Sequence, residues 1–326
     1  MKNNKQLFII FILLFILLSL ISPDRFLTIR NMKTMAFQLP EFALITLGMM
    51  IVILTGGINL SITFASALSG IMAAYVLVNY DFNVWIVILF AFLLAFLVAL
   101  LTGLLNGLIV AYIGVTPILV TLGTGTLFEG ISLKFTRGGT ISGFSEQFSW
   151  IGNGTFLGFP IPILIFLVVA IFTFLLLERT PWGKKVYMLG SNSTAANFSG
   201  INVKKILLQV YIYSSLMAGI ASIIMISRYN TAKVDLGSSY LLQSVSATVL
   251  GGTSISGGTG TVSGTIIALL ILQMISSGLN VLGVNRFFID IIMGAILILV
   301  LTIDYFSNKA EFINGFKSLL GLSTQG

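Results

Sequence analysis

The segment ERTPWGKKVYMLGSNSTAANFSGINVKK, residues 178–205, is a long polar interruption between two apolar runs, and the organisation of the chain follows from it. It holds five of the 17 basic residues in the sequence. Its middle predicts a short helix over residues 194–199, which Gly200 can end and which one of three residues can cap: Ser191, Asn192 or Ser193. Because so short a helix is not stable alone in water, it needs a surface to pack on.

Two interpretations of this helix stay open from the residues alone. Small and apolar side chains give it a compact surface made of Ala195, Ala196, Phe198 and Ile201. That surface can pack on the chain's own membrane-embedded part, which would make the segment a structured loop. Alternatively, the helix docks a soluble partner, and the clustering of basic residues favours a cytoplasmic position for such a docking loop.

The composition is that of an integral membrane protein. Of the 326 residues, 57% are hydrophobic and only 8% are charged, whereas soluble domains carry about 25% charged residues. The net charge of +7 comes mostly from basic residues at the ends of apolar runs, which indicates contact with lipid headgroups rather than nucleic acid. The sequence has no cysteine and no histidine. This argues against thiol or imidazole catalysis and the usual zinc sites, so we expect no catalytic residue, metal or cofactor.

About ten membrane spans can be placed on the apolar runs, since each needs roughly 17–25 residues to cross a bilayer. They are expected at residues 6–22, 41–57, 62–80, 84–104, 116–134, 161–178, 206–226, 240–256, 261–282 and 288–305. The first run is interpreted as a retained helix, because no small-x-small cleavage site follows it. An even number of spans places both termini on one side, which we take as the cytoplasm.

The sequence therefore predicts an all-α polytopic membrane protein, with residues 1–326 forming one membrane domain. Residues 178–205 are expected to form a cytoplasmic loop. Residues 135–160 are expected to form an extracytoplasmic loop, which receives a delivering protein or simply anchors aromatic side chains at the interface.

Two apolar runs are broken by glycine-rich segments, LTGGINLS at residues 54–61 and LGGTSISGGTGT at residues 250–261. Irregular backbone at membrane depth is tolerated only where protein or a water-filled path surrounds it, so these segments point to a solute path. Close packing of helices through small residues is the equal alternative. Neither segment has the lysine of a phosphate-binding loop, so any ATP must bind to another chain.

Polar side chains in and near the spans are the candidates for the solute path: Asn59, Ser61, Thr121, Thr124, Thr253, Ser254 and Asn280. Thr121 and Thr124 are three residues apart and share a helix face, although their hydroxyls can also bond to carbonyls of their own helix. The spans carry almost no charged residues, which argues against an ion-coupled carrier and suits a neutral solute.

At this point the sequence resembles the permease subunits of bacterial ribose-type ATP-binding-cassette importers, a family that also serves other monosaccharides and autoinducer-2. The resemblance covers nearly the whole chain after the first span. It is carried by LTGGINLS at 54–61, NGLIVAYIGVTPILVTLGTGT at 106–126, GKKVYMLGSNSTAANFSGI at 183–201, VLGGTSISGGTGTVSGT at 249–265 and GLNVLGV at 278–284.

The resemblance implies a subunit in the bacterial inner membrane that pairs with a second permease copy or a sister permease. It also implies two cytoplasmic ATPase subunits and an extracytoplasmic sugar-binding protein. The segment TAANFSGI resembles the coupling helix of the family, which assigns ATPase coupling to Gly190, Thr194, Ala195, Ala196, Phe198 and Gly200. We therefore expect a bulky charged residue at Ala196 or Gly200 to abolish ATPase docking but not membrane insertion.

The sequence departs from the family in three places. Asn59 replaces the usual aspartate, Thr194 replaces the usual glutamate, and Ile62-Thr63-Phe64 stand where Val-Gly-Ser is usual. Other functions stay open as alternatives: an importer for nucleosides, autoinducer-2 or branched-chain amino acids, or a channel or carrier that acts alone. A membrane-embedded enzyme is disfavoured, because the spans lack paired carboxylates as well as histidine and cysteine.

Overall fold

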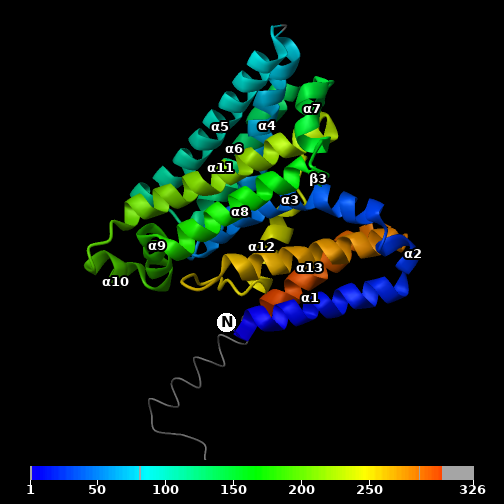
Figure 1. Cartoon of the computed structure of the whole chain (residues 1–326). Helices are drawn as coiled ribbons and strands as arrows, with labels where there is room; N and C mark the ends of the chain where they lie inside the picture. Colours follow the sequence, from blue (N-terminus) through cyan, green and yellow to red (C-terminus); the bar gives the residue numbers. More distant parts are fainter. Residues whose placement is uncertain (1, 81, 286, 303–326) are drawn as a thin grey trace, which may run out of the picture.

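The computed structural model describes residues 2–80, 82–285 and 287–302, and most of them are helical (Figure 1). Within these ranges, seven helices are long and apolar enough to cross a membrane. They are α3 (Ile29–Ile53), α4 (Ile62–Asn79), α5 (Val84–Leu108) with the π-helical turn η1 (Ile109–Ile113), α6 (Pro117–Thr136), α8 (Ile161–Arg179), α11 (Val203–Tyr229) and α13 (Val262–Val281). The prediction of an all-α polytopic membrane protein is therefore confirmed.

The remaining predicted spans fall on shorter apolar helices, so the number ten stays a prediction. These helices are Lys5–Ile21 within α1 (Lys2–Ile21), α12 (Tyr240–Leu250) and Phe287–Thr302. Helix α12 has 11 residues, and at about 1.5 Å per residue it is too short to cross a bilayer. It stops because the glycine-rich segment begins at Gly251. The chain end after residue 302, including the predicted cytoplasmic tail, lies outside the described residues.

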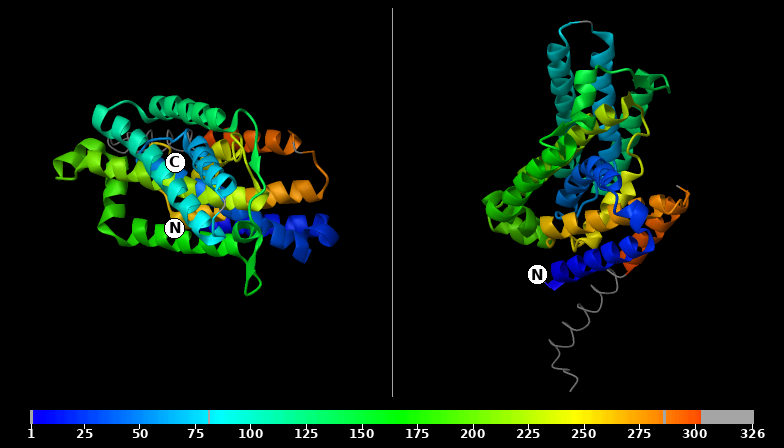
Figure 2. Two further views of the ribbon diagram at one scale, coloured as in Figure 1. Left: turned by 90° about the horizontal axis from the view of Figure 1, so that it is seen from above. Right: turned by 45° about the vertical axis from the view of Figure 1, so that its right-hand side comes forward.

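Helix α3 begins 12 residues before the expected span, at Ile29 rather than residue 41. The first turns of α3 contain several polar residues, so the apolar run in the sequence begins later than the helix does. Pro40 lies inside the helix. From Phe42 to Leu54 its side chains are buried on all sides by other helices. Together with α11 it forms the centre of the molecule, and Figures 1 and 2 show the other long helices arranged around this pair.

Close packing of α5 against α11 depends on small side chains at intervals of four residues. The buried stripe consists of Ala91, Ala95, Ala99, Gly103 and Gly107. A Cβ atom on Gly103 would lie only 2.7 Å from the Cα atom of Ile212 in α11, and one on Gly107 would lie 3.1 Å from the Cα atom of Leu208. The two backbones touch because neither glycine has a side chain, which is how helices associate inside a membrane.

The two polar loops lie at opposite ends of α11, as Figure 1 shows. At its start stand α9 (Pro181–Ser191) and α10 (Ser193–Phe198). At its far end, α7 (Glu146–Asn153) is held by a hydrogen bond of 2.7 Å from the Gly152 amide to Ser227 Oγ. Since α11 has 27 residues, these ends are about 40 Å apart, close to the thickness of a bilayer with its headgroups.

Short strands complete the α7 end of the molecule. Strand β1 (Ile141–Ser142) pairs antiparallel with β4 (Thr231–Ala232), so that Ile141 lies opposite Ala232. Strands β2 (Thr155–Phe156) and β3 (Phe159–Pro160) form a small hairpin before α8. A single helical turn, α2 (Pro23–Phe26), connects α1 to α3. Helix α1 then lies beside α13, as both views in Figure 2 and the side view in Figure 1 show.

Candidate functional site

The predicted short helix is present as α10, and its caps explain where it begins and ends. Asn192 accepts a hydrogen bond of 2.9 Å from the Ala195 amide through its side-chain oxygen. Gly200 adopts φ +80°, a left-handed conformation that glycine reaches without strain. Nothing lies within 4 Å of the place where a Cβ atom would stand on Gly200. A side chain there would therefore strain the turn without striking another part of the chain.

The residues expected to form one surface on α10 lie on two opposite faces. Ala196 and Ile201 are buried against the chain's own core, at 2% and 9% exposed. Thr194, Ala195 and Phe198 point outward, and Phe198 is 87% exposed. The expectation of a single compact surface is wrong, because residues two apart on a helix turn by about 200°. A charged residue at Ala196 would thus disturb packing inside the chain as well as any docking.

Gly190, also expected to take part in coupling, lies where both glycine-rich segments meet α9. A Cβ atom on Gly190 would be 1.8 Å from the Leu54 carbonyl oxygen and 2.5 Å from the Gly258 amide nitrogen. Those two atoms are themselves joined by a hydrogen bond of 2.9 Å. We call this three-way contact of Leu54, Gly190 and Gly258 the glycine junction. It shows that the glycines here serve close approach of backbones, one of the two interpretations open from the sequence.

A side-chain bond strengthens the glycine junction. Tyr187, one turn before Gly190 in α9, donates its hydroxyl to the Gly260 carbonyl at 3.1 Å. Burial, with a smaller contribution from the nearby carboxylate of Glu178, raises the pKa of Tyr187 to about 12. The hydroxyl therefore keeps its proton at physiological pH and remains a donor. Helix α9 is tied in this way to the segment between α12 and α13.

Four of the seven predicted path residues belong to one buried cluster at the end of α3. Asn59 donates to Ser214 Oγ at 3.0 Å and accepts from Ser61 Oγ at 2.8 Å. Asn106 donates to Ser61 Oγ at 2.8 Å and accepts from Thr124 Oγ1 at 2.6 Å. This polar chain joins α5, α6 and α11 to the irregular segment before α4. It holds together without an ionised group at Asn59, so the departure from aspartate leaves a complete hydrogen-bond network.

Thr121, the fourth of the predicted path residues in this cluster, bonds to the same irregular segment from α6. Its hydroxyl lies 3.1 Å from the Ile58 carbonyl and 2.8 Å from the Pro117 carbonyl of its own helix. Bonding back to the helix and bonding across to another segment thus occur at the same side chain. Because the cluster is almost wholly buried, contact of these side chains with a solute stays a prediction.

The other three path candidates are not brought to this cluster. Thr253 and Ser254 lie in the turn after α12, where the Thr253 hydroxyl is buried without a hydrogen-bond partner in the described part of the chain. Asn280 lies near the end of α13, far from that turn along the helix. Sequence reasoning placed all seven in one path, whereas the structure separates them into three groups.

The expectation of nearly charge-free spans missed one buried acid. Glu41 in α3 is fully buried and pairs with Arg228 at the end of α11, with Nη2–Oε1 at 2.7 Å and Nε–Oε2 at 3.1 Å. The hydroxyls of Tyr229 and Tyr240 also donate to the Glu41 carboxylate. The guanidinium of Arg228 neutralises the carboxylate through two hydrogen bonds, and the two phenol hydroxyls add further hydrogen bonds to it. A lone acidic residue in an apolar run was the signal that could have found it.

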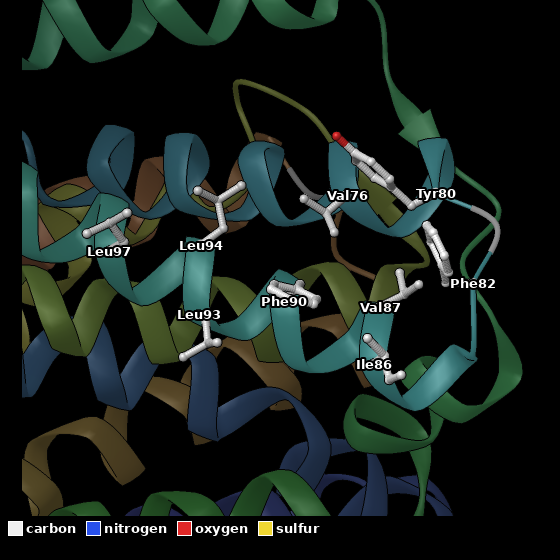
Figure 3. Close-up of a pocket in the computed structure, with 9 residues that line it drawn as sticks. All are labelled: Val76, Tyr80, Phe82, Ile86, Val87, Phe90, Leu93, Leu94 and Leu97. Atoms are coloured by element: carbon white, nitrogen blue, oxygen red, sulfur yellow. The ribbon is translucent and has the colours of Figure 1, made fainter.

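A wide groove between α4 and α5 has the wrong chemistry for a polar solute. It measures about 780 Å³ and is lined by Val76, Tyr80, Phe82, Ile86, Val87, Phe90, Leu93, Leu94 and Leu97. Figure 3 shows these side chains projecting from neighbouring turns, with the Tyr80 hydroxyl as the only polar group among the sticks. The groove suits lipid chains rather than a hydrophilic solute.

Comparisons of the sequence with known proteins point to one family. Residues 31–301 match the family described as branched-chain amino acid transport system / permease component. The ribose import permease protein RbsC of Bacillus subtilis is 37% identical over 90% of this chain and 89% of its own length. The D-allose transport system permease protein AlsC of Escherichia coli is 32% identical over 89% and 87%.

A third relative, the autoinducer 2 import system permease protein LsrD of Yersinia enterocolitica, is 33% identical over 83% of each chain. No solved structure matches the chain. The family match covers most of the sequence, and these relatives are transport permeases rather than enzymes. The chain therefore belongs to this family of transport-system permease components.

Proposed function

We propose that this chain is the membrane-spanning subunit of an ATP-binding-cassette importer for a monosaccharide in the bacterial inner membrane. Two separate cytoplasmic ATPase subunits drive it, an extracytoplasmic binding protein delivers the sugar, and a second copy or a sister permease completes the path. The observation that carries the proposal is α10, a capped helix of six residues with an outward-facing aromatic side chain.

The exposed face of α10 has the features of a docking surface for the ATPase. Thr194 and Phe198 border an open groove of about 690 Å³ that continues to Lys204 at the start of α11. An aromatic side chain that is 87% exposed outside the apolar spans gains from burial in a partner's pocket, as interface anchors do. Lys204, which lines the groove, complements an acidic residue on that partner.

The glycine junction can transmit a movement of α10 to the membrane-spanning segments. Ala196 is the buried residue of α10. Helix α9 directly precedes α10 and places Gly190 against Leu54 and Gly258. In the proposed mechanism, a displacement of α10 by the ATPase moves α9. Because no side chain separates these backbones, α9 in turn moves the end of α3 and the turn before α13. Packed interiors transmit such shifts because they are nearly incompressible.

The proposal also fixes orientation. The α9–α10 end of α11 faces the cytoplasm, and the α7 end faces the binding protein. The buried ion pair of Glu41 and Arg228 lies near the latter end and is already satisfied within the chain. It therefore needs no coupling ion, and the energy source stays on the ATPase subunits.

Uptake by cells tests the function. A strain that lacks the gene for this chain is compared with the same strain carrying it, using labelled D-ribose, D-allose, a nucleoside and leucine. We expect chain-dependent uptake of one of the sugars, and loss of that uptake when the ATPase subunit is deleted. Chain-dependent uptake of only the nucleoside or leucine overturns the sugar assignment, and uptake that persists without the ATPase overturns the importer.

A further inference from the structure

A polar cavity of about 280 Å³ lies between α3, α12 and α13, at the end of α11 that carries Tyr229. Five carboxamide side chains form part of its wall: Asn31, Gln38, Gln243, Gln273 and Asn280. Each of them can both donate and accept hydrogen bonds. Hydroxyls of serine, threonine and tyrosine make up much of the rest, and the lining residues that the structure describes include no aspartate, glutamate, lysine or arginine.

Two side-chain hydrogen bonds cross the cavity wall, one between two carboxamides and one between a hydroxyl and a carboxamide. Gln273 Nε2 donates to Gln38 Oε1 at 3.3 Å, which is long for such a bond. Ser277 Oγ donates to Asn31 Oδ1 at 3.0 Å. Asn31 is held in place by a further bond of 2.9 Å from its Nδ2 to the Phe26 carbonyl. Gln273 and Gln38 bond to each other, so a solute with its own hydroxyls can exchange partners with them at little cost.

An aromatic wall stands beside the carboxamides and is held in a fixed orientation. The rings of Phe42 and Tyr240 are stacked, with centroids 5.4 Å apart and planes at 27°. The Tyr240 hydroxyl donates to Glu41, whose charge is taken up by Arg228. The Glu41 cluster thus positions the aromatic ring at the cavity without presenting a charge to it.

We propose that this cavity binds one neutral polyhydroxylated ring of monosaccharide size as it crosses the chain. Carboxamides match the alternating donors and acceptors of sugar hydroxyls, and an aromatic face suits the C–H face of a sugar ring. The cavity volume of about 280 Å³ is slightly below the range of sites that hold drug-sized ligands, which is about 300–1,000 Å³. A monosaccharide is smaller than such ligands. The described lining presents hydroxyls and carboxamides rather than charged side chains, which suits a neutral solute better than a phosphorylated or amino-acid solute. This assignment rests on the proposed import function and names the residues that would contact the transported sugar.

The absence of cysteine from the natural sequence makes a direct test simple. Ser276, which lines the cavity, is changed to cysteine in the complete importer, and its reaction with a small methanethiosulfonate reagent is followed in membrane vesicles. Sugar at about ten times its half-saturating concentration should slow the modification by about tenfold by mass action. The control is Ser238→Cys, at a position outside the cavity lining, where the same sugar should leave the rate unchanged.

A second variant keeps the test independent of cysteine chemistry. Gln243→Leu should lower uptake about tenfold to a hundredfold, since it leaves a sugar hydroxyl without its partner, while the ATPase still co-purifies. Gln6→Leu, the same change at an exposed position on α1, should leave uptake unchanged.

Each outcome separates the two proposals. Normal uptake by Gln243→Leu, or no protection of Ser276→Cys in an importer that carries the sugar, overturns the cavity assignment and leaves the import function standing. If the unmodified importer carries no monosaccharide at all, the proposed function fails, and the sugar class assigned to the cavity fails with it.

Discussion

The glycine junction makes a sharp prediction for Gly190→Ala. The added Cβ atom would lie 1.8 Å from the Leu54 carbonyl oxygen, whereas real Cβ contacts are essentially never shorter than 3.0 Å. At least one backbone must therefore move by about 1.2 Å, the difference between these two distances. The atoms that the Cβ would strike belong to the backbones of Leu54 and Gly258. The clash therefore cannot be relieved by a change of side-chain rotamer.

The cost of this substitution follows from two contributions. Overpacking of a well-packed interior costs about 1–3 kcal/mol. The same displacement stretches the hydrogen bond of 2.9 Å from the Gly258 amide to Leu54, and the loss of such a bond costs about 1 kcal/mol. We therefore expect Gly190→Ala to destabilise the junction by about 2–4 kcal/mol.

The matched control is Gly123→Ala, because Gly123 lies in α6 with nothing within 4 Å of the place where its Cβ atom would stand. Alanine there should be neutral or stabilise the helix by up to about 1 kcal/mol. Both variants are purified in mild detergent, and thermal unfolding is followed with ATPase-driven uptake measured in parallel. A lower Tm and weaker uptake for Gly190→Ala alone are expected. Unchanged Tm and uptake for Gly190→Ala would refute the close three-way contact.

Three further substitutions test separate parts of the structure. Glu41→Gln should lower stability by about 3–5 kcal/mol in thermal unfolding, because it leaves buried Arg228 without its partner; recovery is expected when Arg228→Gln is added, and equal damage by the double variant would contradict the pairing. Asn106→Leu should cost about 1–3 kcal/mol in total, because it removes the hydrogen bonds of Asn106 with the Ser61 and Thr124 hydroxyls, and an unchanged stability would contradict a role for this network. Tyr187→Phe should cost about 1 kcal/mol through the lost bond to Gly260. Since folding raises the pKa of Tyr187 from 10.0 to about 12, its contribution should be complete below pH 10 and decline as the pH rises through 12, so a loss of that contribution between about pH 6 and 9 would contradict this account.

The local features of the chain were predictable from sequence, because they depend on neighbouring residues. The turn around α10 follows from a capping side chain before the helix and Gly200 after it, and the structure has both. The class of the fold follows from apolar runs of bilayer length. The boundaries of α3 and α12 did not follow, because hydropathy alone registers neither the polar first turns of α3 nor the early stop of α12 at Gly251.

Contacts between distant segments could not be read from the sequence. Glu41 and Arg228 are 187 positions apart, and nothing in either local sequence identifies the partner. The same holds for the glycine junction, where composition suggested irregular backbone but not which segments touch. Asn280 illustrates the limit for the site, since its residue type suggested a polar path, whereas only the packing of α13 against α3 and α12 places it at the cavity.

The central claim is that α10 docks a separate ATPase, and isolation of the complex from native membranes tests it most directly. The tagged full chain is extracted in mild detergent, and the proteins that co-purify are identified and quantified by mass spectrometry. We compare the unmodified chain with Phe198→Asp on α10 and with Phe159→Asp, another exposed phenylalanine, in β3 at the other end of the molecule. The account predicts a stoichiometric soluble ATPase with the unmodified chain and with Phe159→Asp, and its loss with Phe198→Asp. Recovery of the unmodified chain without any ATPase, or full retention of the ATPase by Phe198→Asp, would contradict the account.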